Sequence, residues 1–345
     1  MSSLATRPLG RTGMQITVVG AGTWAQGGAN WKYNWGPQDD SCSVRALHRA
    51  LSLGVNWIDT AAVYGRGHAE EVVGHALKAI PAGERPFIFT KCGLRWSDSD
   101  IFGDPLKLLR PSSVKQECDA SLRRLGIERI DVYQFHWPDQ SGALVEDSWG
   151  AMGELIDEGK VRFGAVSNFD IALLERCEKV RHVDSLQPPL SLIDRRAGAE
   201  LVSWCAKNGT GVVCYSPMQA GLLTDSFSAE RVALMSPSDW RLWHPEFSHF
   251  TPPALHKNLE MRDRLRPIAK RHGTTVASVA IAWVLSWSGV TGAIAGSRSP
   301  DQVDGWIGAG ALTLLDDDLD EIEFALADLG VGFGPTRPPR AGAAA

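Results

Sequence analysis

The stretch that decides the fold begins with the run IDVYQFH at residues 130–136 and ends with VRFGAVS at residues 161–167. Both runs are short and rich in β-branched and aromatic residues, as buried strands are. Between them apolar residues recur at helical spacing, at Trp149, Met152, Leu155 and Ile156. Gly159 then stops the helix. A strand, a helix and a second strand in this order predict a right-handed βαβ unit with parallel strands.

The same alternation extends outward to both ends of the chain. Six further strand-like runs occupy residues 16–22, 55–59, 86–92, 185–190, 211–216 and 291–296. Helical periodicity lies between them, as in the segment that Asp39 and Asp40 cap and Gly54 ends. Eight strand–helix units predict an α/β fold, a closed (β/α)8 TIM barrel. We expect one domain over residues 1–333.

Two segments depart from the alternation. The interval between the seventh and eighth strands is the longest, and residues 218–258 in it are rich in Pro, Ser and Trp. Long loops in compact domains are usually functional, so we expect a lid-like loop here. The Pro, Gly and Ala tail at residues 334–345 is expected to be disordered.

Composition excludes several classes of function. The 345 residues are 44% hydrophobic and carry a net charge of −5 without a Lys/Arg-rich block, so we expect neither a nucleic-acid nor a membrane partner. No apolar run approaches the roughly 20 residues of a membrane helix, and the start lacks the apolar core of a secretory signal, so we expect a cytoplasmic location. Scattered cysteines and histidines predict reduced thiols and no metal site.

A glycine-rich turn offers one weak lead. Gly20, Gly22 and Ala25 follow a strand in the pattern G-x-G-x-x-A of dinucleotide-binding turns, with Asp40 further on. That pattern should open a helix directly, yet helical periodicity starts only near Asp39. We therefore interpret this segment as the turn after the first barrel strand.

The carboxyl ends of barrel strands converge on one face, which carries the active site in this architecture. Asp59, Lys91 and His136 stand at the ends of the second, third and fourth strands, and Tyr64 follows Asp59 by five residues. Each has an ordinary explanation alone, as a cap, a solvated charge or a surface polar group. On neighbouring strands of one rim they predict a proton-transfer unit.

The chemistry of that unit follows from the residue types. Tyrosine has a pKa near 10 and donates a proton at neutral pH only when a cation stabilises its phenolate, which Lys91 can do. A carboxylate at Asp59 would keep Lys91 charged, and His136 could donate a hydrogen bond to the same substrate oxygen. There is no Ser or Cys nucleophile with a base and no metal cluster. Hydride from a nicotinamide is the missing reagent.

These residues and their surroundings resemble the aldo-keto reductase family from about residue 9 to residue 329. The matching stretches are VNWIDTA (55–61) with Tyr64 and Gly65, Thr90-Lys91, His136 with Pro138-Asp139, GAVSNF (164–169), Tyr215-Ser216-Pro217, and IAGSR (294–298) with Pro300 and Gln302. The resemblance implies Tyr64 as general acid/base, Lys91 and Asp59 as its tuning pair, and His136 as the substrate-orienting donor. Gly22-Thr23-Trp24, WGPQDD (35–40) and Lys91-Cys92-Gly93 look like the bacterial branch with inositol-catabolism-associated reductases and general stress proteins.

The resemblance also implies a cofactor site. Ser167, Asn168 and Gln187 would hold the nicotinamide carboxamide, and Tyr215 would stack on its ring. The remaining cofactor positions are Ser216, Pro217, Gly221, Gly296, Ser297, Arg298 and Gln302. Arg298 beside Ser297 suits the 2′-phosphate of NADP(H), whereas Asp301 keeps NAD(H) as the less favoured alternative.

The sequence leaves three functions open. The first is an NADP-dependent oxidoreductase acting on an aldehyde, a ketone or a sugar or polyol hydroxyl. The second is a non-catalytic cofactor-sensing module like the potassium-channel β subunits, although nothing here resembles a channel-docking N-terminal extension. The third is a barrel glycosidase using Asp59 and Asp139, which leaves Lys91 unexplained.

Tryptophan is unusually frequent, with 13 residues against 11 Phe and 4 Tyr. Six fall in predicted strands or helices, where packing accounts for them: Trp57, Trp149, Trp204, Trp283, Trp287 and Trp306. The other seven are expected on the active-site rim: Trp24, Trp31, Trp35, Trp96, Trp137, Trp240 and Trp243. We hypothesise a tryptophan-walled pocket for a ring-shaped substrate, which would also exclude water from hydride transfer.

Overall fold

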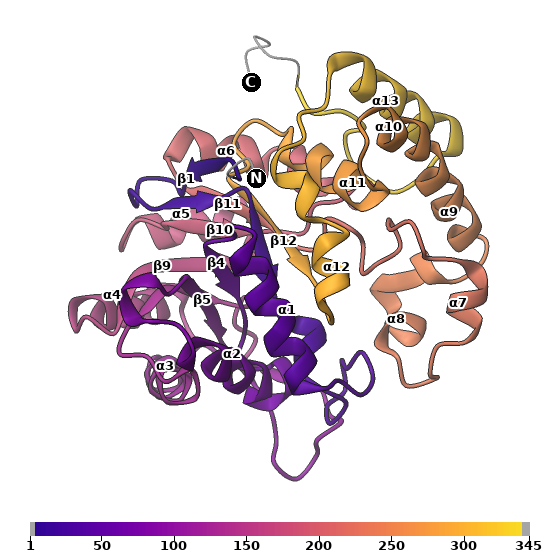
Figure 1. The fold of residues 1–345 in the computed structure, drawn as a ribbon. Helices are drawn as coiled ribbons and strands as arrows, with labels where there is room; N and C mark the ends of the chain where they lie inside the picture. Colours follow the sequence, from indigo (N-terminus) through magenta and orange to yellow (C-terminus); the bar gives the residue numbers. More distant parts are fainter. Residues whose placement is uncertain (1–3, 340–345) are drawn as a thin grey trace.

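A computed structural model describes residues 4–339, without the side chains of residues 245–247 (Figure 1). Eight parallel strands close into a barrel in the order β10-β11-β12-β3-β4-β5-β8-β9. They are β3 (Val19–Gly22), β4 (Trp57–Asp59), β5 (Phe87–Cys92), β8 (Ile130–Phe135), β9 (Val161–Ser167), β10 (Ser185–Gln187), β11 (Gly211–Cys214) and β12 (Gly292–Gly296). The predicted (β/α)8 TIM barrel is confirmed.

Helices surround the strands, as Figure 1 shows. Those of the wall are α1 (Asp40–Ser52), α2 (His68–Lys78), α3 (Pro111–Leu125), α4 (Val145–Asp157), α5 (Ile171–Glu178), α6 (Leu201–Asn208), α11 (Val276–Leu285), α12 (Pro300–Asp304) and α13 (Asp316–Leu329). The start of α1 is as expected, because the Asp39 side chain accepts hydrogen bonds from the backbone N–H groups of Ser41 and Cys42.

The first predicted strand is divided in the structure. Its beginning forms β2 (Gln15–Thr17), which pairs antiparallel with β1 (Thr6–Pro8), and only β3 from Val19 joins the barrel. The hairpin brings Leu9, Met14 and Ile16 into one buried cluster with Trp57 of the barrel interior. A single strand over residues 16–22 was therefore wrong, because burying this hairpin against the barrel requires a change of pairing partner at Val18.

Alternation along the strands builds the barrel interior in layers. Trp57, Phe89 and Val132 belong to the buried apolar cluster inside the barrel. Two residues further along the same strands, and therefore on the same face, come Asp59, Lys91 and Gln134. An apolar layer thus supports a polar layer at the carboxyl end of the barrel.

Packing explains the glycine-rich end of β3. A Cβ at Gly20 would lie 2.1 Å from the Trp57 ring, so only glycine leaves room for that side chain. After Gly22 comes the short 3-10 helix η1 (Trp24–Gln26), and α1 begins only at Asp40. The segment is the turn after a barrel strand, as the sequence indicates.

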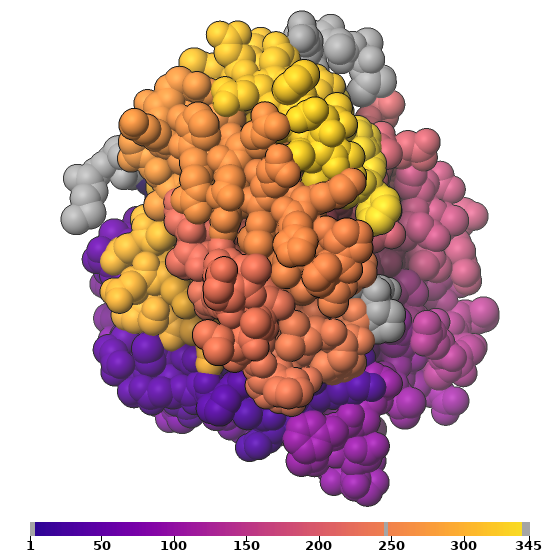
Figure 2. All heavy atoms as spheres, turned by 90° about the vertical axis from the view of Figure 1, so that its right-hand side faces the viewer, coloured from indigo at the N-terminus to yellow at the C-terminus, as the bar shows by residue number. Residues whose placement is uncertain are grey.

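The segment between β11 and β12 contains helices rather than an extended loop. Before α11 of the wall they are α7 (Ala229–Ala233), α8 (Trp240–Trp243), the 3-10 helix η5 (Pro245–Phe250), α9 (Ala254–Arg264) and α10 (Arg266–Arg271). Figure 2 shows this part, in salmon and orange, over the middle of the face that lies on the right in Figure 1. We call residues 218–258 the lid segment.

The described part of the tail, residues 334–339, makes contacts with the rest of the protein. Arg337 forms ion pairs with Asp316, over 2.8 Å, and with Asp320 of α13. Arg195 donates a hydrogen bond to the carbonyl oxygen of Gly334. Gly334 and Arg337 of the tail thus contact Arg195 and α13, and residues 340–345 lie outside the described residues.

Within residues 4–339, every helix is too short or too polar to cross a membrane.

Candidate active site

A cavity of about 1530 Å³ opens at the carboxyl ends of the strands. Asp59, Tyr64 and His136 line it, whereas Lys91 lies below its surface. All the positions implied for a cofactor also line this cavity, namely Ser167, Asn168, Gln187, Tyr215, Ser216, Pro217, Gly221, Gly296, Ser297, Arg298 and Gln302. The fold therefore brings these residues to one cleft from strands far apart in the sequence.

A buried ion pair lies at the base of the cavity. Lys91 Nζ donates a hydrogen bond to Asp59 Oδ1 over 2.5 Å and another to the carbonyl oxygen of Thr60 over 2.9 Å. The Lys91 and Asp59 side chains are 0% and 3% exposed. Burial lowers the pKa of Lys91, and the Asp59 carboxylate opposes that shift. An unpaired charge here would be very costly, so each group holds the other in its charged form.

Tyr64 and His136 stand above this pair. Lys91 Nζ lies 5.3 Å from the centroid of the Tyr64 ring, and the rings of Tyr64 and His136 are 5.7 Å apart. Burial, with the charge of Asp59, raises the pKa of Tyr64 well above its ordinary value. Burial and the Lys91 ammonium lower the pKa of His136, so this imidazole is neutral at pH 7. A protonated phenol and a neutral imidazole thus face one space.

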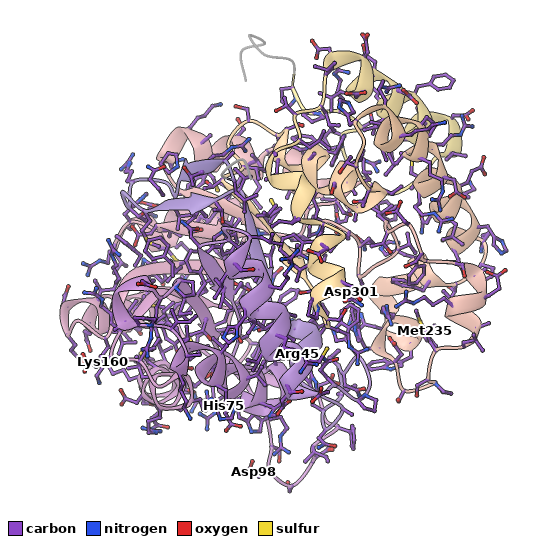
Figure 3. The ribbon with its side chains drawn as sticks, viewed as in Figure 1. Arg45, His75, Asp98, Lys160, Met235 and Asp301 are labelled. Carbon is purple, nitrogen blue, oxygen red and sulfur yellow. The ribbon has the colours of Figure 1, made fainter. Side chains whose placement is uncertain are left out.

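The turn that carries Tyr64 is built on a close backbone approach. A Cβ at Gly65 (φ +61°) would lie 2.0 Å from the carbonyl oxygen of Gly27. Arg66 also has a positive φ of 59°, and it donates a hydrogen bond to Asp98 over 3.0 Å. Asp98 lies on the loop between β6 (Leu94–Arg95) and β7 (Leu106–Lys107), which projects from the barrel (Figure 3). Such a conformation persists only when its surroundings hold it.

A connected set of polar groups lies beside His136. The Asn168 side chain donates hydrogen bonds to the His136 carbonyl oxygen over 2.9 Å and to Ser167 Oγ over 3.1 Å. Its Oδ1 accepts a hydrogen bond from the Tyr215 hydroxyl over 2.8 Å. Asn168 has a φ of 61°, which asparagine tolerates better than most residues. The Tyr215 ring is thereby fixed at the cavity wall.

The turn after β11 has an unusual backbone. Ser216, Gln219 and Ala220 have φ values of 56°, 45° and 52°, and Gly221 follows with 94°. Within this turn the backbone N–H groups of Gln219 and Gly221 donate hydrogen bonds to the carbonyl oxygens of Ser216 and Met218, over 2.8 and 3.2 Å. All four line the cavity.

Arg298 is held by the loop between β3 and α1. Its Nε donates to Gln38 Oε1 over 2.7 Å, its Nη1 to the Trp35 carbonyl oxygen over 3.0 Å, and its Nη2 to the Pro37 carbonyl oxygen. The Gln38 side chain also donates to the Arg298 carbonyl oxygen over 2.8 Å. The turn after β12 and this loop are therefore joined in both directions. The three groups that accept these hydrogen bonds from the Arg298 guanidinium are uncharged.

Five of the seven predicted rim tryptophans line the cavity: Trp24, Trp31, Trp35, Trp137 and Trp240. Trp96 packs in the adjacent cluster with Trp31 and Leu94, outside the lining. Trp243 also stands outside it, 37% exposed, against Tyr33 and His244. Trp96 and Trp243 therefore lie beside residues that line the cavity and outside the lining itself.

Several lining residues were missed by the sequence interpretation. Tyr33 and Arg241 line the cavity from the β3–α1 loop and the lid segment, and Trp306, expected in the core, is buried yet reaches the cavity wall. Gln134 was missed below the cavity, although a polar residue two positions before His136 in an apolar strand was a visible signal. Among residues 4–339, no three His, Cys, Asp or Glu side chains converge as metal ligands.

The chain is similar to known proteins over most of its length. The profile of the aldo/keto reductase family matches residues 18–327. The chain is 32% identical over 294 residues to aldo-keto reductase YhdN of Bacillus subtilis, covering 85% of each protein. It is 32% identical over 320 residues to the NADH-specific methylglyoxal reductase of Escherichia coli, covering 90% of this chain and 95% of that protein.

Two solved structures share the architecture. The glycerol dehydrogenase AKR11B4 from Gluconobacter oxydans superimposes with a TM-score of 0.84 at 33% identity, covering 99% of this chain and 100% of that one. The holo form of aldo-keto reductase AKR11C1 from Bacillus halodurans has a TM-score of 0.76 at 23% identity, over 93% of this chain and 96% of that one. The second likeness supports the fold alone.

Proposed function

This chain belongs to the aldo/keto reductase family of oxidoreductases, and from that premise we propose that it transfers hydride between a nicotinamide dinucleotide and an aldehyde, a ketone or a sugar or polyol hydroxyl. The observation that carries the proposal is the buried Lys91–Asp59 pair directly beneath Tyr64 and His136. Burying an ion pair costs desolvation free energy, and a buried ammonium beside a phenol is what a tyrosine that donates a proton near neutral pH needs.

The four residues have distinct roles in this proposal. A bound nicotinamide supplies the hydride for reduction, or accepts it in oxidation. Tyr64 donates its phenolic proton to the carbonyl oxygen as the carbon is reduced, and the Lys91 ammonium stabilises the phenolate that remains. His136, being neutral, donates a hydrogen bond that holds the same oxygen. Asp59 keeps Lys91 protonated.

The residues present fit a dinucleotide. Tyr215 offers a ring fixed by its hydroxyl, Gln187 offers an amide, and the turn from Ser216 to Gly221 lines the same cavity, where it would meet the pyrophosphate. We propose NADP(H), because Arg298 beside Ser297 can bind a 2′-phosphate. NAD(H) is the second candidate, since the E. coli relative is NADH-specific and Arg298 is already engaged by the β3–α1 loop.

The glycosidase alternative loses support. Asp139 accepts hydrogen bonds from the backbone N–H groups of Leu109, Ser141 and Ala143, over 2.6–2.9 Å. Among the described residues that line the cavity, Asp139 is absent. Asp59 is committed to Lys91. Neither carboxylate stands ready to flank a glycosidic bond.

The aromatic wall favours a substrate with an apolar face, such as a cyclic sugar or polyol or an aromatic carbonyl. Trp24 lies nearly parallel to Tyr64, with the ring centroids 6.1 Å apart and an interplanar angle of 17°. A flat substrate could bind over the same surface. A cytoplasmic location and the bacterial branch stay predictions.

The test is a screen for oxidation and for reduction, with turnover monitored by the absorbance of the nicotinamide. NADP⁺ and NAD⁺ are offered with sugars and polyols including glycerol, and NADPH and NADH with aldehydes and ketones including methylglyoxal. Turnover is expected, and Tyr64→Phe should lower kcat about 10²–10⁴-fold while leaving dinucleotide binding intact. Intact NADPH binding without turnover by the native protein would instead indicate a cofactor-sensing module, and an unaffected Tyr64→Phe variant would exclude Tyr64 as the acid.

A further inference from the structure

Gln134 is buried at the centre of the barrel, where a polar side chain needs an explanation. It is 0% exposed and stands above the apolar layer formed by Trp57, Phe89 and Val132. On β8 it is the direct register partner of Lys91 on β5. An amide buried without partners destabilises the fold, so its contacts show what it is for.

The Gln134 amide makes two hydrogen bonds. Its Nε2 donates to Asp59 Oδ2 over 3.2 Å, and its Oε1 accepts from Gln187 Nε2 over 3.0 Å. Gln187 Nε2 also donates to Asp59 Oδ2, over 2.9 Å. The carboxylate therefore has Lys91 on one oxygen and two glutamine amides on the other.

The direction of every amide in this set follows from Asp59. An ionised carboxylate only accepts hydrogen bonds, so both glutamines must turn their NH₂ groups toward it. Gln134 Oε1 then takes the second N–H of Gln187. With both of its N–H groups used, Gln187 can offer a ligand only its carbonyl oxygen. Gln187 lines the cavity, whereas Gln134 does not.

We propose that Gln134 is a positioning residue that joins the proton-transfer unit to the cofactor site. It holds Asp59 in place beneath Lys91 and takes the second N–H of Gln187, so that Gln187 presents only its carbonyl oxygen, an acceptor, to the NH₂ of a carboxamide ligand. The inference rests on the proposed function in one respect, that the ligand is a nicotinamide dinucleotide.

Two variants and one control test this role. Gln134→Leu keeps similar bulk and removes both hydrogen bonds. Gln134→Glu keeps the shape but can donate to Asp59 only while its carboxyl is protonated. Tyr133→Phe is the control, because it alters an equally buried side chain one residue earlier that packs in the cluster outside the barrel.

The first measurement is dinucleotide affinity, from quenching of tryptophan fluorescence by NADPH and by NADH between pH 5 and 8. Gln134→Leu should bind each about tenfold more weakly at every pH, the worth of one hydrogen bond. Gln134→Glu should bind weakly at pH 8 and recover toward native affinity as the pH falls, because protonation restores the donor to Asp59. The charged and titratable groups around it are Asp59 from β4, Lys91 from β5, and Tyr64 and His136 at the cavity, with Glu70 of α2 acting on Lys91.

A second measurement needs no ligand. The introduced Glu is buried beside Asp59, so its pKa should rise on folding, and the destabilisation of Gln134→Glu relative to the native protein should grow as the pH rises. Native affinity in Gln134→Leu, or a pH profile of Gln134→Glu parallel to that of the native protein, would overturn the inference. Failure of the native protein to bind either dinucleotide would overturn the proposed function instead, and the unfolding measurement would still decide whether Gln134 holds Asp59.

Discussion

The ring centroid of Trp24, on the loop after β3, lies 4.4 Å from that of Trp240 on α8 of the lid segment. Trp35 meets the same Trp240 ring edge-on at 5.4 Å. An aromatic contact therefore joins the lid segment to the opposite rim of the cavity, directly beside Tyr64. Aromatic pairs of this kind contribute about 0.5–1.5 kcal/mol beyond the area they bury.

The tryptophan wall should determine how well a ring-shaped substrate is used. Trp24→Ala and Trp137→Ala remove cavity-lining rings, and we expect each to lower kcat/KM on the best cyclic substrate about tenfold or more. Trp243→Ala is the matched control, since this ring is partly exposed and outside the cavity. Equal effects of all three changes in steady-state kinetics would argue against a substrate wall.

Cofactor preference should depend on the contact between Arg298 and Gln38. Gln38→Leu removes one acceptor from the guanidinium, so Arg298 is freer to bind a 2′-phosphate, and the ratio of kcat/KM for NADPH over NADH should rise several-fold. Arg298→Gln should lower that ratio about tenfold or more. The surface variant Arg45→Gln on α1, labelled in Figure 3, controls for a general loss of charge. A uniform change with both dinucleotides would contradict the role of Arg298 in phosphate binding.

The turn that carries Tyr64 should tolerate no side chain at residue 65. Gly65→Ala adds a Cβ that would lie 2.0 Å from the Gly27 carbonyl oxygen, on a backbone with φ +61°. We expect a loss of about 2–5 kcal/mol in the free energy of unfolding, from the left-handed backbone and the clash, together with reduced turnover. Gly36→Ala is the control, because its φ is +84° but nothing lies within 4 Å of the added Cβ. Urea unfolding should show a larger loss of unfolding free energy for Gly65→Ala than for Gly36→Ala. Similar losses in the two variants would show that the close approach to Gly27 does not add to the cost.

Acid should destabilise the protein in part through His136. Burial and Lys91 lower its pKa in the folded state, so below the ordinary histidine range near 6.5 the unfolded chain binds a proton that the folded chain does not. The free energy of unfolding therefore falls as the pH decreases from about 7 toward that lowered pKa. His136→Gln should flatten this dependence in urea titrations at pH 5–7.5, and His75→Gln, an exposed residue of α2 (Figure 3), should not. Parallel slopes for His136→Gln and the native protein would refute this.

The sequence predicted the barrel because its signals are local. Short runs rich in β-branched and aromatic residues, such as residues 161–167, and helical periodicity after Asp39 report burial within one element, and eight such units in series have few ways to close. Asp59, Lys91 and His136 could be chosen because each stands at a strand end. The division of residues 16–22 was not visible, since it depends on which strand lies next to each half.

By itself the sequence determined the fold class, the family and the strand-end residues near the cavity, because β-branched runs, helical patterns and their order are written along one chain. Only the tertiary structure decided that Gln134 and Gln187 share Asp59, that Arg298 is held by a loop some 260 residues away, and that Trp306 rather than Trp243 reaches the cavity. Those outcomes depend on barrel register and on the direction of side chains between elements distant in sequence. Hydrogen bonding and packing settle both after the chain has closed.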